Sequence, residues 1–114
     1  ALYQFSWHEF CDWYLELIKP DLFQDADPRR RAATQSVLLQ TLSALVRLLH
    51  PIMPFITEEI WQKLPGTSGS IMRSAFPTAE TMYRQPEAVR QMVLAMAVVN
   101  GIRNIRGEMG IAPS

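Results

Sequence analysis

The chain has 114 residues, and its 11 basic and 11 acidic side chains give a formal net charge of zero. A hydrophobic fraction of 48% excludes wholesale disorder, and the length allows one domain and not two. A single cysteine cannot form an internal disulfide, which fits a reducing compartment. The uncharged, apolar-rich run at residues 91–102 is far shorter than the roughly 20 residues that span a bilayer. We therefore expect no membrane partner.

Charge is distributed unevenly along the chain. Residues 1–28 hold six acids and one lysine, residues 29–57 hold four arginines and no acid, and residues 58–114 hold six bases and five acids. The three segments thus carry net charges of −5, +4 and +1. Proteins that bind nucleic acid usually have a basic excess, so the overall zero argues against such a function. The segment charges nevertheless permit a one-sided contact with RNA.

The first two expected elements are helices. At 100° per residue, the aromatic and aliphatic side chains of residues 3–18 fall on one arc. Pro20 is expected to stop this helix, because proline cannot donate to the helical ladder. The second helix is expected to begin with Asp27 as the N-cap and Pro28 as the first helical residue, and to run to about Leu49.

Two further helices complete the expected fold. The third covers residues 54–64, and the fourth runs from about residue 86 to 109. A loop at about residues 65–85 separates them, with residues 70–74 as a candidate short extended segment. Four amphipathic helices of this kind predict an all-α, antiparallel helical bundle, with residues 1–114 as one domain.

No catalytic constellation is evident, and we expect no catalytic residue, metal or cofactor in this chain. His8 and His50 are far apart in the sequence, and Cys11 lies on an apolar arc, where it is expected to act as a small hydrophobe. Closely spaced zinc ligands are absent. Glu58 and Glu59 are expected to be solvated.

Aromatic side chains mark the expected core. Trp7, Tyr14 and Trp61 fall on apolar arcs and are expected to pack inside the fold. Trp13 points away from the main arc of its helix. It is expected to pack against a partner helix or domain, with stacking on a nucleic-acid base as the alternative.

Arginines are the strongest candidates for function. Residues 29–31 place three arginines at a helix start, where cations oppose the helix dipole. Pairing with Asp25 and Asp27 is the expected reason. Arg103 and Arg106 suit the dipole at the end of the last helix. The angular position of Arg106 within the apolar arc favours a paired structural role, with phosphate contact as the alternative.

Four segments resemble the valyl-tRNA synthetase family. They are F-C-D-W-Y-L-E at residues 10–16 with Lys19-Pro20, L-L-H-P-I-M-P-F-I-T-E-E-I-W at 48–61, S-I-M at 70–72 with Phe76-Pro77, and I-R-N-I-R-G-E-M at 102–109 with Pro113-Ser114. Their order and spacing match the family over nearly the whole chain. The first and last segments favour the valyl over the isoleucyl and leucyl enzymes.

This resemblance implies the helical anticodon-binding domain of a class I synthetase, which attaches valine to tRNA(Val) with ATP and Mg²⁺. The family's H-I-G-H and K-M-S-K-S catalytic signatures do not occur here. We therefore expect a non-catalytic piece of a longer cytoplasmic enzyme. Its partners would be tRNA(Val), the catalytic domain and the C-terminal region of the same chain.

Site residues are harder to carry over, because the matching motifs are largely apolar. Candidates for contact with tRNA, or with neighbouring domains, are Lys19, Arg47, Arg103 and Arg106. His50-Pro51 and Pro54 are expected to set a bend, with Thr57 and Glu58 supporting the turn. Two alternatives stay open: the same domain of an isoleucyl- or leucyl-tRNA synthetase, and a helical protein-interaction bundle with no RNA role.

Overall fold

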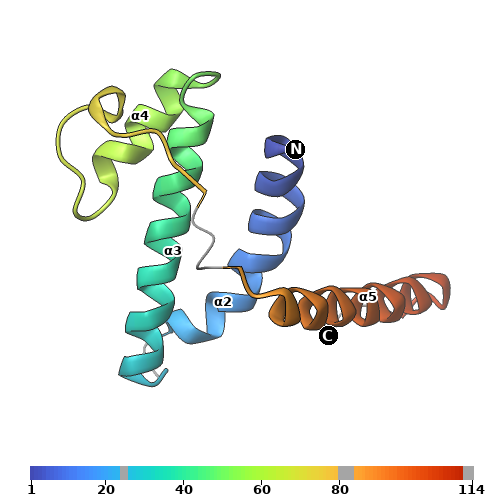
Figure 1. Cartoon of the computed structure of the whole chain (residues 1–114). Helices are drawn as coiled ribbons and strands as arrows, with labels where there is room; N and C mark the ends of the chain where they lie inside the picture. The colour runs from blue at the N-terminus through green and yellow to red at the C-terminus, as the bar shows by residue number, and fades with distance from the viewer. Residues whose placement is uncertain (24–25, 80–83, 112–114) are drawn as a thin grey trace. The chain divides into compact units, whose positions relative to one another are not determined.

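The computed structural model describes residues 1–23, 26–79 and 84–111 (Figure 1). Within these ranges every regular element is helical, which confirms the predicted all-α fold. The chain divides into two units, Ala1–Thr78 and Ala79–Ser114. The first unit is a helical bundle and the second contains one long helix. That residues 1–114 act as a single domain stays a prediction.

A continuous helix begins the first unit. It consists of α1 (Leu2–Gln4), η1 (Phe5–Tyr14) and α2 (Leu15–Leu22). The central segment η1 is a π-helix, in which each amide donates to the carbonyl five residues earlier. At its end, for example, the amide of Leu15 donates to the carbonyl of Phe10. A π-helix has more residues in each turn than an α-helix, so side chains four or five apart share a face.

The π-helical geometry explains which aromatic residues face the interior. Phe10 is buried, and its ring stacks on that of Tyr14, with 5.6 Å between ring centroids. Trp7, three residues before Phe10, is 56% exposed. The expectation that Trp7 packs in the core is therefore wrong for this chain, because it assumed 100° per residue. Tyr14 and Trp13 are half-buried.

Pro20 lies inside α2 and does not end it. Its ring removes the amide that would otherwise donate to the carbonyl of Glu16. Only two helical residues follow, so the loss is confined to the last turn of the helix. The predicted stop at Pro20 is wrong for this reason.

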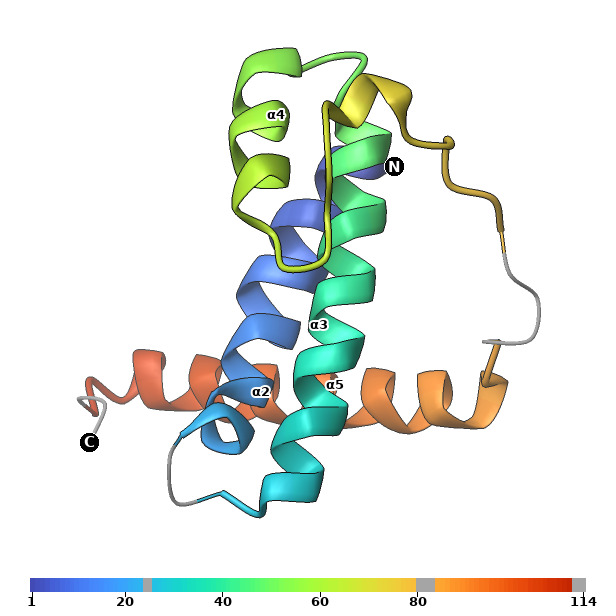
Figure 2. The same ribbon diagram turned by 90° about the vertical axis from the view of Figure 1, so that its left-hand side faces the viewer.

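The next helix, α3 (Pro28–Leu49), begins where the sequence predicts. Asp27 is the N-cap, and its carboxylate accepts a hydrogen bond from the amide of Arg29 at 3.1 Å. Pro28 occupies the first helical position, where a missing amide costs nothing. The helix α3 runs back alongside α2 in both views (Figures 1 and 2).

The core lies where α4 (Pro54–Lys63) folds back on the C-terminal half of α3. Val46, Trp61 and Ile71 are buried against one another, and partly buried aliphatic side chains surround them: Leu42, Ile60 and Leu64. The expected burial of Trp61 is confirmed. Ile71 begins η2 (Ile71–Arg73), a 3-10 turn, so the candidate extended segment at residues 70–74 is wrong.

Length and composition alone would allow α3 to cross a membrane. Its most apolar 18-residue window has a mean hydropathy of 1.2, and it is the one such helix among the described residues. A core helix of a soluble protein can meet the same criteria. The absence of a membrane partner stays a prediction.

The second unit contains α5 (Pro86–Glu108), which matches the predicted helix closely. Pro86 occupies its first turn, and Gly110 follows its end with a φ of +64°, a conformation that glycine adopts without strain. Within this unit, the large apolar side chains of α5 are exposed except for the half-buried Met96.

Candidate nucleic-acid interface

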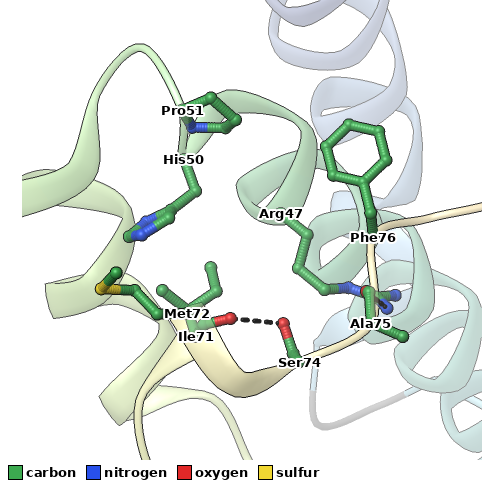
Figure 3. A pocket seen from close by; sticks show the side chains of 8 residues that line it. All are labelled: Arg47, His50, Pro51, Ile71, Met72, Ser74, Ala75 and Phe76. Atoms are coloured by element: carbon green, nitrogen blue, oxygen red, sulfur yellow. Dashed lines mark hydrogen bonds between the residues drawn. The ribbon is translucent and has the colours of Figure 1, made fainter.

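Arg47 lies in the last turn of α3, with its side chain half-buried. Its Nε donates to the carbonyl of Ser43 at 3.1 Å, within the same helix. Its Nη1 donates to the carbonyl of Ala75 at 3.0 Å, in the segment after η2 (Figure 3). Both acceptors are neutral, and among the described residues Arg47 makes no ion pair. Arg47 thus orients the segment while keeping its charge unneutralised.

A buried hydroxyl organises the bend between α3 and α4. Thr57 is 1% exposed, and its Oγ1 lies 2.7 Å from the carbonyl of Met53 and 2.8 Å from Nδ1 of His50. The carbonyl can only accept, so the hydroxyl proton is donated there. His50 must then carry its proton on Nδ1 and donate to Thr57, which leaves Nε2 as an acceptor in the neutral ring. The expected support of the turn by Thr57 is confirmed.

Glu58 connects α4 to the start of η2. Its Oε2 accepts from the hydroxyl of Ser70 at 2.9 Å and the amide of Ile71 at 3.1 Å, and its Oε1 accepts from Gln62 at 2.6 Å. The Gln62 bond lowers the pKa of Glu58 most, with Ser70, Ile71 and the nearby His50 acting in the same direction and desolvation opposing them. Glu58 is therefore not simply solvated, contrary to expectation. Sequence spacing missed the contacts with Ser70 and Ile71 because these residues lie beyond the end of α4.

Lys19 is an exposed cation on α2 and forms an ion pair with Glu16, one turn earlier in the sequence. The side chains of both residues are more than half exposed. An exposed pair of this kind contributes little to stability, about 0–1 kcal/mol. A phosphate could displace Glu16 at small cost.

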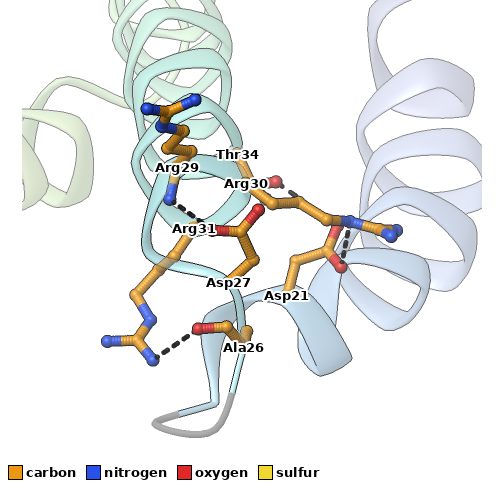
Figure 4. A network of polar contacts seen from close by, with 7 residues as sticks. All are labelled: Asp21, Ala26, Asp27, Arg29, Arg30, Arg31 and Thr34. Atoms are coloured by element: carbon orange, nitrogen blue, oxygen red, sulfur yellow. Dashed lines mark hydrogen bonds and ion pairs between the residues drawn. The ribbon is translucent and has the colours of Figure 1, made fainter.

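Arg30 and Arg31, at the start of α3, use their side chains for contacts within the first unit (Figure 4). Nε of Arg30 lies 2.7 Å from Asp21 at the end of α2, and the hydroxyl of Thr34 donates to the same carboxylate at 3.3 Å. Arg31 donates to the carbonyl of Phe23 at 2.6 Å.

This arrangement differs in part from the sequence prediction. Asp27 caps the amide of Arg29, as predicted for an N-cap, but it is Asp21 that pairs with Arg30. Asp25 lies outside the described residues. Asp21 could have been considered from the sequence as an acid just before the turn, although its partner is nine residues away.

Arg103 and Arg106 lie in the last two turns of α5. Arg103 is exposed and Arg106 is half-buried. The partial burial of Arg106 accords with its angular position within the apolar arc.

The sequence comparisons decide the family. The chain matches the family model described as "Anticodon-binding domain of tRNA ligase" over residues 1–114. The chain belongs to this anticodon-binding domain family.

Relatives of this anticodon-binding domain are valine–tRNA ligases. The chain is 52% identical to the enzyme of Syntrophotalea carbinolica over 99% of its length, and 53% identical to that of Geobacter sulfurreducens over 100%. It spans 13% of the length of each of these relatives. The resemblance to valyl-tRNA synthetases is thereby confirmed. The family match does not favour a bundle without an RNA role, and the relatives do not favour the isoleucyl and leucyl alternatives.

The four candidate cations of this anticodon-binding domain divide between its two units. Lys19 and Arg47 belong to the first, and Arg103 and Arg106 to the second. Within the first unit the two cations are well separated. Lys19 lies near the corner where Asp21 meets Arg30, and Arg47 is 17 residues beyond Arg30 on α3, about 25 Å along the helix axis. A single phosphate group could not reach both side chains.

No group of three or more potential metal ligands gathers among the described residues.

Proposed function

We propose that this chain is the anticodon-binding domain of a valine–tRNA ligase, a cytoplasmic enzyme that attaches valine to tRNA(Val) using ATP and Mg²⁺. The observation that supports this most strongly is the match to the anticodon-binding family over residues 1–114, together with about 50% identity to valine–tRNA ligases along the whole chain. The catalytic domain and the C-terminal region belong to other parts of the same enzyme. Residues 1–114 serve as one domain that docks the tRNA.

Four cations make the phosphate contacts in this proposal. Lys19 and Arg103 are exposed, and Arg47 and Arg106 are half-buried at the ends of long helices. Each phosphate contact releases a counterion, so the logarithm of the binding constant should fall with the logarithm of the salt concentration. The exposed acids on the first helix, Glu9 and Asp12 among them, face away from the RNA, since like charges raise the energy of approach.

The test is a titration of the full-length enzyme with tRNA(Val) at several salt concentrations. The variant carries four substitutions: Lys19→Ala, Arg47→Ala, Arg103→Ala and Arg106→Ala. We expect weaker binding and a salt slope reduced by about three units, because each lost phosphate contact removes about 0.7–0.9.

A matched control removes the same charge elsewhere, with Arg29→Ala, Lys63→Ala, Arg84→Ala and Arg90→Ala. It should retain both the affinity and the slope. Equal losses in the two variants would mean that net charge, and not these four positions, attracts the tRNA. An enzyme that charges isoleucine or leucine in preference to valine would contradict the assigned substrate.

A further inference from the structure

A pocket lies between the end of α3 and residues 71–76, which lie beside it (Figure 3). Arg47 and His50 line it from the end of α3, and Ile71, Met72, Ala75 and Phe76 line it from the segment after α4, with the guanidinium of Arg47 beside Ala75. Its volume is about 120 Å³, and none of its lining residues is acidic. The pocket therefore presents a cation, an imidazole and an aromatic ring without a carboxylate.

Two backbone carbonyls hold the guanidinium group of Arg47 in a fixed orientation at the pocket. A guanidinium has five N–H donors, and the structure uses one on Ser43 and one on Ala75. Three donors are left over among the described contacts, and they belong to Nη1 and Nη2. These two nitrogens form the fork that binds two oxygens of a phosphate at once. Because two carbonyls already hold the side chain, little rotamer entropy is lost on binding.

Phe76 supplies a second kind of contact at the rim of the pocket. Its side chain is 62% exposed, and Met72 beside the pocket is 79% exposed. An exposed aromatic ring next to an unneutralised arginine is the combination on which proteins stack unpaired bases. The backbone at Phe76 is held in place by the preceding residue, whose carbonyl accepts from Arg47.

The size of the pocket limits what can enter. Pockets that enclose a drug-sized ligand have roughly 300–1,000 Å³, so a volume of about 120 Å³ accommodates one small group. A phosphate fits this volume and would pair with the charge of Arg47, and the rest of the nucleotide must then lie outside the pocket, over Phe76. Nδ1 of His50 is 2.8 Å from the hydroxyl of Thr57, so Nε2 is the ring nitrogen left to contact a ligand.

We propose that this pocket is a single-nucleotide subsite for RNA, in which Arg47 binds a backbone phosphate and the base attached to that nucleotide stacks on Phe76. The proposal rests on the proposed function, since it assigns one position within the tRNA contact. It adds Phe76 as a base-stacking residue and gives Arg47 a bidentate contact.

Photo-crosslinking tests the position directly. In the full-length enzyme, Phe76 is replaced by a photoreactive benzophenone amino acid, and the complex with tRNA(Val) is irradiated. We expect a crosslink to one unpaired nucleotide. The matched control places the same amino acid at Phe55, an aromatic residue of α4 that is 90% exposed and does not line the pocket. That position should give no crosslink.

Binding measurements test the two contacts separately. Phe76→Ala should weaken tRNA binding about tenfold, consistent with the loss of one stacked base, and should leave the salt slope unchanged. Arg47→Gln should reduce the slope by about 0.7–0.9. Arg47→Lys should keep most of the slope but lose affinity, because an ammonium cannot form the two-pronged contact. A purely structural role for Arg47 would not separate Lys from Gln in this way.

Each outcome bears on the proposal. If the unmodified enzyme binds tRNA(Val) but position 76 gives no crosslink and Phe76→Ala binds normally, the subsite is wrong and the proposed function stands. If the unmodified enzyme does not bind tRNA(Val), both fail. Hydrogen exchange of residues 70–76 checks the fold of the segment. If Arg47→Gln loosens this segment, the tRNA affinity of Phe76→Ala and the crosslink at position 76 still decide whether the subsite exists.

Discussion

Glu58 on α4 accepts a hydrogen bond from the hydroxyl of Ser70, 12 residues later in the chain. The same segment is held at two other points. Trp61 donates through Nε1 to the carbonyl of Gly69 at 3.1 Å, and Arg47 donates to the carbonyl of Ala75 at 3.0 Å. Residues 69–75 are therefore fixed by side chains from both helices of the α3–α4 hairpin, which positions one wall of the pocket.

Replacing Glu58 by Gln should loosen this segment. The neutral amide loses the charge that strengthens the bonds from Ser70 and Ile71, and its NH₂ group faces donors where an oxygen is needed. We expect faster hydrogen exchange at the amide of Ile71 in the full-length protein. Glu59→Gln is the control, because Glu59, the sequence neighbour of Glu58, pairs with exposed Lys63 on the surface of α4 and not with residues 70–71 in the part of the chain that the structure describes. Similar exchange at Ile71 in both variants would contradict the anchoring role of Glu58.

The protection of Ile71 should also depend on pH. The pKa of Glu58 is lowered from its ordinary value of 4.5, chiefly by the hydrogen bond from Gln62. A carboxyl with a lowered folded pKa stabilises the fold fully above its unfolded pKa, and this contribution is lost as pH falls through the folded value.

Protection, corrected for intrinsic exchange, should therefore be constant from about pH 7 to about pH 5 and decline in more acidic solution. In Glu58→Gln the decline attributable to this carboxyl should disappear. A wild-type profile that is flat through the acidic range would contradict the assignment.

The corner between α2 and α3 should depend on Asp21. Its side chain is 18% exposed and accepts from both Arg30 and Thr34. Because Arg30 is 70% exposed, solvent screens the pair, and we expect a coupling of about 0.5–1 kcal/mol between Asp21→Ala and Arg30→Ala. A double-mutant cycle on the opening free energy of α2 amides, measured by hydrogen exchange, gives this value. Additive single effects would show that the pair contributes nothing.

Trp61 should be the most sensitive aromatic residue of the α3–α4 hairpin. It is 8% exposed and contacts Val46 and Ile71 in the core. Trp61→Ala should destabilise the hairpin by about 3–5 kcal/mol through the cavity it leaves. Trp7→Ala, at a 56% exposed position, should have a much smaller effect. Thermal unfolding, with hydrogen exchange of α4 to localise the change, distinguishes the two.

Local signals in the sequence predict the helix starts well. Asp27-Pro28, Pro54 and Pro86 each place a helix start where the structure has one, because capping and proline geometry act within a few residues. Pro20 misleads for a related reason: a proline close to a helix end removes few hydrogen bonds, so α2 continues past it.

Features that depend on tertiary geometry could not be predicted in this way. The π-helical pitch of η1 changes which side chains share a face, and this turns Trp7 outward. The contacts of Glu58 with Ser70 and of Arg47 with Ala75 join residues 12 and 28 positions apart. No periodicity encodes such pairs. The candidate cations were found from charge and resemblance, whereas the pocket beside Arg47 required the fold.

The two ends of α5 should respond differently to the loss of an arginine. Arg90 lies in the first turns of α5 and Arg103 lies near its C-terminal end, and both are exposed. If Arg103 contacts a phosphate, Arg103→Gln should reduce the salt slope of tRNA binding by about 0.7–0.9, and Arg90→Gln should not. Both substitutions remove one charge from the same helix, so a general electrostatic effect would change the two slopes equally. Titrations of the full-length enzyme with tRNA(Val) at four or more salt concentrations separate these results. Equal slopes would remove Arg103 from the set of contacts while leaving the family assignment intact.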